Sequence, residues 1–171
     1  MRNLSFLVLI AVLILSACGR PNIDEQTGQK TIRLAHLVNP TQSTHIMSEE
    51  FKKQVEEESD GRLRVELYPS GSLFPSDREA IEAVQLGNVE MTIPALASVS
   101  GFDQDFMILD LPYLFEDTAE AYSVLDGPFG QGLLDGLEDA NIKGLVYGEN
   151  GFGHITNNVQ PVYTPDAIEG Q

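Results

Sequence analysis

The side chains that most often carry chemistry are few in this sequence and far apart. Its three histidines, His36, His45 and His154, form no His-x-x-x-His pair and have no cysteine beside them, which argues against a metal site. The three aspartates between positions 103 and 110 lack the spacing of a calcium loop. No Gly-x-Ser-x-Gly, phosphate-binding loop or dinucleotide fingerprint is present. We therefore expect no catalytic residues, no metal and no cofactor.

The single cysteine, Cys18, lies where a lipid could be attached to it. Arg2 precedes an apolar run at 6–15, which is shorter than the ~20 residues that span a bilayer and is typical of a secretory signal. The four residues that end at Cys18, Leu-Ser-Ala-Cys, resemble a bacterial lipobox, in which the cysteine is acylated and becomes the new N-terminus. An ordinary signal peptide with an incidental cysteine is the alternative. We predict a lipoprotein signal peptide over 1–17 and lipidation of Cys18.

The charge of the chain narrows the range of partners. Its 171 residues include 26 acidic and 10 basic side chains, giving a formal net charge of -16. Phosphate binding needs clustered Lys and Arg, so we expect no nucleic-acid partner. The same charge argues against unaided docking on an anionic membrane surface. It does not exclude an anionic ligand, because a local pocket can be positive within an acidic protein.

Alternating strand and helix patterns over 31–171 form the framework that would position a binding site. The stretch 18–30 is polar and contains Pro and Gly, which is typical of a flexible tether after the lipidated cysteine. Further on, apolar residues either alternate, as in strands, or recur at helical spacing. We predict strands at 31–38, 62–68, 89–93, 142–147 and 154–159, and helices at 46–58, 77–86, 118–125 and 128–140, with another beginning at 164.

Several helix ends carry local signals. Ser76 followed by Glu79 predicts a capping box, and Asp117 with Glu120 predicts a second N-cap. Gly87 occupies the place of a C′ glycine. Strands that alternate with helices favour an α/β fold with a mainly parallel sheet, whose ligands bind at the strand ends. Because the sequence ends at Gln171, just inside a predicted helix, we expect a longer natural protein.

With these elements in order, the sequence resembles the DctP-type solute-binding proteins of tripartite ATP-independent periplasmic (TRAP) transporters. Each matching stretch alone is a weak signal, but together they are specific, since they follow the family's order and cover 31–171. The stretches are YPSGSL (68–73), DREAI (77–81), AVQLGNVEM (83–91), DLPYLF (110–115), VLDGPFG (124–130), ENGF (149–152), TNN (156–158) and PVYTPDAIEG (161–170).

The resemblance implies a periplasmic-binding-protein-like fold of type II, in which two α/β lobes trap the ligand between them. Residues 31–171 would form the first lobe and the start of the hinge region, with the second lobe missing. It also implies a binding component without enzymatic activity outside the cytoplasm, which the predicted lipidation of Cys18 would anchor to the membrane. Such a protein would capture a small organic acid, such as a C4-dicarboxylate or another carboxylate, and deliver it to the small and large membrane subunits of the transporter.

The resemblance also suggests which residues contact the ligand. In the family, arginines bind the carboxylate through two parallel charge-assisted hydrogen bonds. The principal arginine would lie a few residues past Gln171, and a second position that often holds arginine is Gly153 here. The ligand-binding residues that we predict within the sequence are Asn39, Thr41, Asp77, Arg78, Ala95, Asn150, Phe152 and His154.

Four of these residues also have structural explanations. Asp77 could serve only the helix N-terminus, and Arg78 could pair with a surface acid. Phe152 could belong to the core, and His154 could be structural. For the whole protein two other functions stay open: a solute-binding module that presents its ligand to a receptor, and a secreted, lipid-anchored enzyme.

Overall fold

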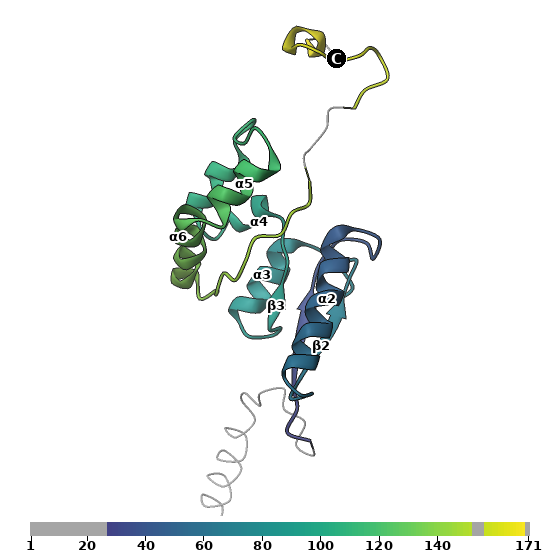
Figure 1. Ribbon diagram of the computed structural model, residues 1–171, viewed down its shortest axis with the longest axis vertical. Coiled ribbons are helices and arrows are strands. Elements are labelled where there is room, and N and C mark those ends of the chain that lie inside the picture. The colour runs from purple at the N-terminus through teal and green to yellow at the C-terminus, as the bar shows by residue number, and fades with distance from the viewer. Residues whose placement is uncertain (1–26, 152–155, 170–171) are drawn as a thin grey trace, which may run out of the picture.

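Three parallel strands form the sheet (Figure 1). The computed structural model describes residues 27–151 and 156–169. The strand β1 (Lys30–Ala35) lies between β2 (Leu63–Tyr68) and β3 (Met91–Thr92), in the order β2-β1-β3. Both strand pairs are parallel, with Ile32 opposite Val65 in the first pair. The predicted α/β fold with a parallel sheet is confirmed.

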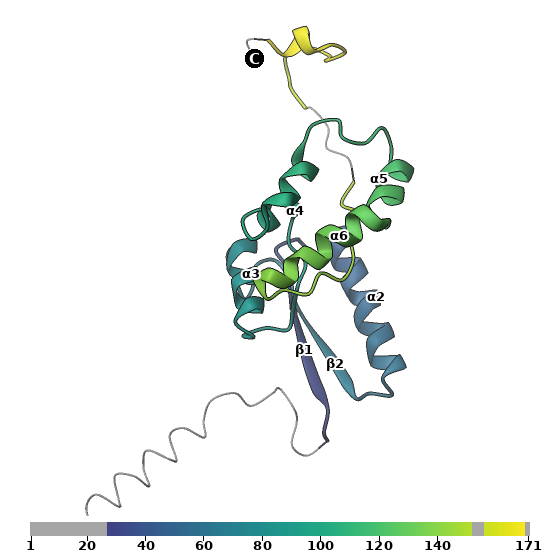
Figure 2. The ribbon, with the colours of Figure 1, turned by 90° about the vertical axis from the view of Figure 1, so that its left-hand side faces the viewer.

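The centre of the sheet is buried on both faces. Successive strand residues point to opposite faces, and the adjacent residues Leu34 and Ala35 are only 1% and 3% exposed. Helix α2 (Ser43–Glu58) packs along β2, and α3 (Asp77–Gln85) lies beside β3. Figure 2 shows β1 and β2 side by side, with α2 next to β2. Each strand therefore leads into a helix through a connection at its carboxyl end.

The predicted N-caps are present. The Ser76 hydroxyl accepts a hydrogen bond from the backbone N–H of Glu79 at 3.3 Å, at the start of α3. In α5 (Thr118–Leu125), the Asp117 carboxylate accepts from the N–H of Glu120 at 2.8 Å. Each bond satisfies an N–H group that has no partner within its own helix.

Gly87 ends α3 in the left-handed conformation that its position requires. Its φ angle is +71°, which glycine adopts without the steric penalty of a Cβ. Its N–H donates to the carbonyl of Val84 at 3.0 Å, and the N–H of Asn88 donates to the carbonyl of Ala83 at 2.8 Å. These two bonds make a Schellman motif, so the predicted C′ glycine is confirmed.

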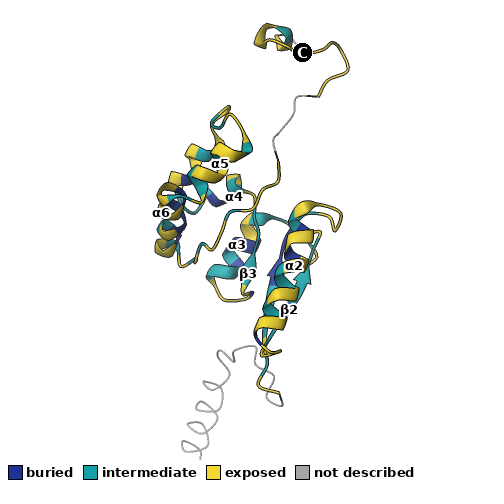
Figure 3. Cartoon of the chain, viewed as in Figure 1, coloured by how far each residue is buried: buried dark blue, intermediate teal, exposed yellow. Residues whose placement is uncertain are grey.

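A second core lies among the helices that follow the sheet (Figure 3). Its buried members come from α3, from two further helices and from two 3-10 helices, and Phe106 is only 1% exposed. Full burial of one such side chain contributes about 1.5–3 kcal/mol relative to exposure. The cluster consists of Ile81, Val99, Phe106, Leu133 and Leu137. The additional elements are α4 (Leu96–Val99), α6 (Pro128–Gly136) and the 3-10 helices Gln104–Asp110, Leu137–Ala140 and Pro165–Ile168.

The predicted strand at 142–147 does not form. Ile142 and Tyr147 pack against the helical core, and the Tyr147 hydroxyl donates to the carbonyl of Gly130 at 2.9 Å. A Cβ at Gly144 would lie 2.8 Å from the side chain of Leu134, so the chain passes too close for another residue type. The segment makes side-chain contacts but pairs with no described strand, because apolar alternation alone does not supply a ladder partner.

The strand predicted at 154–159 is also wrong where it is described. Residues 154 and 155 lie outside the described ranges, and 156–159 forms a turn instead. The Asn157 side-chain oxygen accepts from the N–H groups of Val159 and Gln160, at 2.9 and 3.0 Å. An asparagine that bonds backbone groups two and three residues on favours a turn over a strand.

The strand boundaries also differ from the prediction. The strand β1 begins at Lys30, inside the predicted tether 18–30, because the N–H of Lys30 donates to the carbonyl of Arg62 at 2.9 Å. It also ends at Ala35, short of the predicted end at residue 38. The strand β3 is shorter than 89–93, since the Glu90 carboxylate accepts from the backbone N–H of Arg33 at 2.8 Å, in place of a ladder bond.

Among the residues that the structure describes, none belongs to a helix long and apolar enough to cross a membrane.

Candidate ligand-binding site

The carboxyl ends of the three strands meet at one edge of the sheet. From this edge the chain continues into the connections 36–42, 69–76 and 93–95, which lead to α2, α3 and α4. In parallel α/β sheets, ligands bind in the crevice outside such an edge, where helix N-termini favour negative charge. Four of the eight predicted ligand contacts lie here or beside it: Asn39, Thr41, Asp77 and Ala95.

Asn39 and Thr41 are exposed in the connection after β1. The N–H of Gln42 donates to the carbonyl of Asn39 at 3.0 Å, closing a turn that presents both side chains to solvent. Among the described residues, neither side chain forms a hydrogen bond on which the fold depends. Both side chains are exposed, and their contact with a ligand stays a prediction.

Asp77 and Ala95 are brought together from two connections. One Asp77 carboxylate oxygen accepts from the backbone N–H of Ala95 at 3.1 Å and from the Ser98 hydroxyl at 3.4 Å. Asp77 also lies in the first turn of α3, where a negative charge is favourable. Its carboxylate thus joins α3 to the segment that enters α4, a role that the sequence alone did not reveal.

Arg78 is directed along the surface of α3. Its guanidinium lies 2.9 Å from the Glu82 carboxylate and 5.7 Å from the centre of the Phe102 ring. An exposed pair one helical turn apart is worth a few tenths of a kcal/mol, about 0.3–0.5. The surface pairing considered for Arg78 is the arrangement observed, and Arg78 does not join Asp77 and Ala95.

The remaining predicted residues lie elsewhere. Asn150 is exposed in the segment after α6, before the second gap in the described ranges. Phe152, His154 and Cys18 lie outside the described residues.

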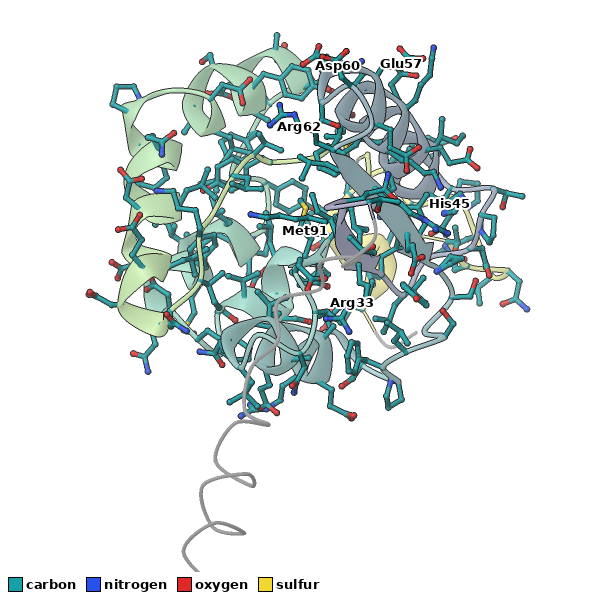
Figure 4. All side chains as sticks on the ribbon, turned by 90° about the horizontal axis from the view of Figure 1, so that it is seen from below. Arg33, His45, Glu57, Asp60, Arg62 and Met91 are labelled. Atoms are coloured by element: carbon teal, nitrogen blue, oxygen red, sulfur yellow. The ribbon has the colours of Figure 1, made fainter. Side chains whose placement is uncertain are left out.

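All four arginines in the described ranges have partners in the structure. Arg33 forms an ion pair with Glu90 at 2.9 Å, whose hydrogen bond raises the pKa of the guanidinium above its usual value. Arg62 donates to the carbonyl of Ser59 at 3.0 Å. Arg64 pairs with Glu66 at 3.1 Å, and Arg78 with Glu82. Figure 4 shows Arg33 and Arg62 well apart from each other.

Sequence reasoning missed a pair of histidines at this edge. The ring nitrogen Nε2 of His36 lies 3.0 Å from Nδ1 of His45, and the rings meet edge to face with centroids 5.2 Å apart. His36 follows β1 directly and His45 lies in the first turn of α2. His36 lies in the predicted strand 31–38 and His45 just before the predicted helix 46–58, and no local signal in the sequence indicates that their rings meet.

An open groove of about 710 Å³ runs between α2 and β2, beside His45. Charged side chains of both signs line it together with Leu67 and Pro69. Since both signs are present, the groove offers no single-sign field for an anion. Its charged residues are Glu49, Lys52, Lys53, Glu56 and Glu57.

The sheet order and the helix at each carboxyl end define an α/β fold in which a ligand crevice would lie outside the carboxyl edge of the sheet. Residues 34–171 match the family of bacterial extracellular solute-binding proteins, family 7, known as DctP. The chain belongs to this family. Its members bind solutes and are not enzymes, so the predicted absence of catalysis is confirmed by the family.

Relatives of known identity cover most of the chain. It is 37% identical over 151 residues to the C4-dicarboxylate-binding protein DctB of Bacillus subtilis, covering 86% of this chain and 43% of that protein. The TRAP periplasmic solute-binding protein of Sulfurospirillum deleyianum, solved with bound succinate, superposes with a TM-score of 0.74 at 31% identity, over 82% of this chain and 45% of the other.

A second solved structure binds a different acid. The sugar acid binding protein DctPAm of Advenella mimigardefordensis, in complex with galactonate, has a TM-score of 0.76 at 34% identity, over 82% of this chain and 45% of the other. The chain therefore spans less than half the length of these relatives.

Proposed function

We propose that this chain is part of the extracytoplasmic binding component of a TRAP transporter, one that captures a small organic acid and delivers it to the membrane subunits. The observation that carries the proposal is the match of 34–171 to a family whose solved relatives hold succinate and galactonate. The ligand is a carboxylate, either C4-dicarboxylate-like or a sugar acid.

In this proposal the edge of the sheet forms one wall of the ligand crevice. Asn39 and Thr41 offer exposed polar groups, and Asp77 holds the Ala95 backbone at the opposite connection. Asn150 is a further candidate contact, and so are Phe152 and His154, which lie outside the described residues. Since each described arginine already has a partner, the charge that binds the carboxylate comes from another part of the protein.

Transport would follow from closure of two lobes around the ligand. A ligand that binds the closed state more tightly shifts the population toward it, and the closed state docks on the small and large membrane subunits. Lipidation of Cys18 would hold the protein at the membrane outside the cytoplasm, with the stretch after it as a tether.

A thermal-shift measurement on the chain extended past Gln171 to the length of its relatives tests the ligand class. Succinate and galactonate are compared with galactose, which has no carboxylate. A ligand at about 100 times its dissociation constant stabilises by about 2.7 kcal/mol, which raises the melting temperature by several degrees. We expect this for one acid and not for galactose; equal shifts for the sugar and its acid would contradict the proposal.

A further inference from the structure

The two buried histidines tie the end of β1 to the start of α2. His36 is 1% exposed and His45 is 8% exposed, so both rings are buried where they meet. Their nitrogens lie at hydrogen-bond distance, 3.0 Å, across nine positions of the sequence. The loop that this bond closes, 37–42, contains both Asn39 and Thr41.

Backbone bonds hold one side of this loop to the end of β2. The N–H of His36 donates to the carbonyl of Tyr68 at 3.1 Å, and its carbonyl accepts from the N–H of Gly71 at 3.2 Å. The carbonyl of Val38 accepts from the N–H of Ser70 at 3.1 Å. The loop therefore leaves the sheet from a fixed position.

The other side of the loop has a weaker local anchor. The N-cap of α2 is Gln42, whose side chain makes no capping bond, in contrast to Ser76 and Asp117 at α3 and α5. The ring of His45, in the first turn of α2, bonds to His36 instead. This bond is the side-chain link between the sheet and the start of the helix.

The number of protons on the pair decides whether the bond exists. A hydrogen bond between two ring nitrogens needs one proton between them, which a neutral pair and a singly protonated pair both have. A doubly protonated pair has two N–H groups facing each other and no acceptor. The second proton therefore breaks the bond and places two charges in a buried site.

The surroundings of the pair oppose a proton on His36. Nε2 of His45 lies 3.5 Å from the Glu49 carboxylate. Burial, and then the charge of His45, lower the pKa of His36, while the backbone of Val38 opposes this shift. The other titratable groups on the neighbouring elements are Lys52, Lys53 and Glu56 on α2, Glu66 and Tyr68 on β2, and Arg33 on β1.

We propose that His36 and His45 are positioning residues of the ligand crevice: their ring-to-ring hydrogen bond holds the loop 37–42 in place, and a second proton on the pair releases it. This inference rests on the proposed function, because it assigns Asn39 and Thr41 to ligand contacts. It predicts that carboxylate affinity is steady near neutral pH and falls in acid, by up to about tenfold per pH unit once the second proton binds.

The first experiment tests whether the histidine pair holds the loop 37–42. It uses the ligand-free chain, extended past Gln171. Two-bond ¹H–¹⁵N spectra at pH 7.5 should show His36 protonated on Nε2 and His45 bare on Nδ1 and protonated on Nε2, toward Glu49. Amide hydrogen exchange over 37–45 should accelerate as the pH falls, beyond the intrinsic trend that distant loops show. Two rings that titrate independently, with unchanged protection of the loop, would overturn the inference.

The second experiment measures the affinity for galactonate, whose carboxyl group stays ionised at pH 5. His45→Ala should weaken binding at every pH. His45→Asn should recover part of the loss, because its amide oxygen accepts from His36 Nε2 in either protonation state, and its affinity should decline less between pH 7 and 5 than that of the unsubstituted protein. Gln54→His, which adds an exposed ring on α2, is the control and should leave the pH profile as it was.

The outcomes separate the two proposals. Affinity that is flat from pH 8 to 5 in the unsubstituted protein would overturn the inference and leave the proposed function intact. If neither galactonate nor succinate binds at pH 7.5, the proposed function is contradicted, while the exchange measurement still decides whether the pair holds the loop.

Discussion

At the scale of single residues, Asp77 joins two connections at the edge of the sheet. Its carboxylate accepts from the N–H of Ala95 and from the Ser98 hydroxyl. A carboxylate engaged in this way fixes the backbone of the crevice wall. A ligand would then contact the backbone that Asp77 positions as well as the charge of Asp77. The sequence predicted its nearness to the ligand, but the partner lies 18 residues further along the chain.

Replacing Asp77 tests this role. Asp77→Ala should lower the free energy of unfolding by about 1–2 kcal/mol, because the Ala95 N–H loses a charged acceptor. Asp77→Asn keeps a neutral acceptor and should lose less. Urea denaturation of the three proteins measures the difference, and equal losses for the two variants would show that the hydrogen bond contributes nothing.

His36 allows a prediction on pH. Burial lowers the pKa of its imidazole below the usual value of 6.5, so the folded state binds this proton more weakly than the unfolded state. Its contribution to stability is therefore complete above pH 6.5 and is lost as the pH falls below that value. NMR titration of the His36 ring proton should give a midpoint below 6.5, and a midpoint above it would contradict the assignment.

At the scale of elements, two glycines show that the backbone conformation of a position and the space around it are separate reasons for a glycine. A Cβ at Gly87 or at Gly132 would meet nothing within 4 Å, but only Gly87 has a left-handed backbone, with φ +71°. Gly87→Ala should destabilise by about 1 kcal/mol or more, whereas Gly132→Ala inside α6 should stabilise by about 0.5–1 kcal/mol. Thermal unfolding of both variants checks this; a shift of the same sign in both would refute the reason given for Gly87.

The elements that the sequence predicted well are those with local signals. Ser76, Asp117 and Gly87 act within a few residues of themselves, so their roles could be read without knowing the fold. The strand at 142–147 failed because a strand also needs a partner, and Ile142 and Tyr147 found a helical core instead.

The candidate site was predictable to a similar extent. Asn39, Thr41, Asp77 and Ala95 lie at or beside the sheet edge because parallel strands end together there. The bond between His36 and His45 could not be derived from composition, since it depends on where a loop returns to the sheet. Of the arginine pairings, that of Arg33 with Glu90 depends on a tertiary contact, whereas Arg62, Arg64 and Arg78 pair with residues within four positions of themselves.

At the scale of the whole molecule, several large apolar side chains are exposed. Tyr113, Val146 and Tyr163 are 94%, 75% and 89% exposed. Exposed apolar surface of this kind binds hydrophobic dyes and favours self-association. We expect the 171-residue chain to give more fluorescence with 8-anilinonaphthalene-1-sulfonate, per molecule, than the chain extended past Gln171. Equal fluorescence from both would mean that these residues are not covered by the added length.

The order β2-β1-β3 also bears on how quickly the domain assembles. The central strand β1 comes first in the chain, and its partners in β2 lie closer in sequence than those in β3, since Leu34 is opposite Leu67 in the first pair and Met91 in the second. Contacts between residues close in sequence form fastest, because little loop entropy is lost. We expect the unit of β1, α2 and β2 to nucleate folding, and β3 to join later through its two residues and the Arg33–Glu90 pair.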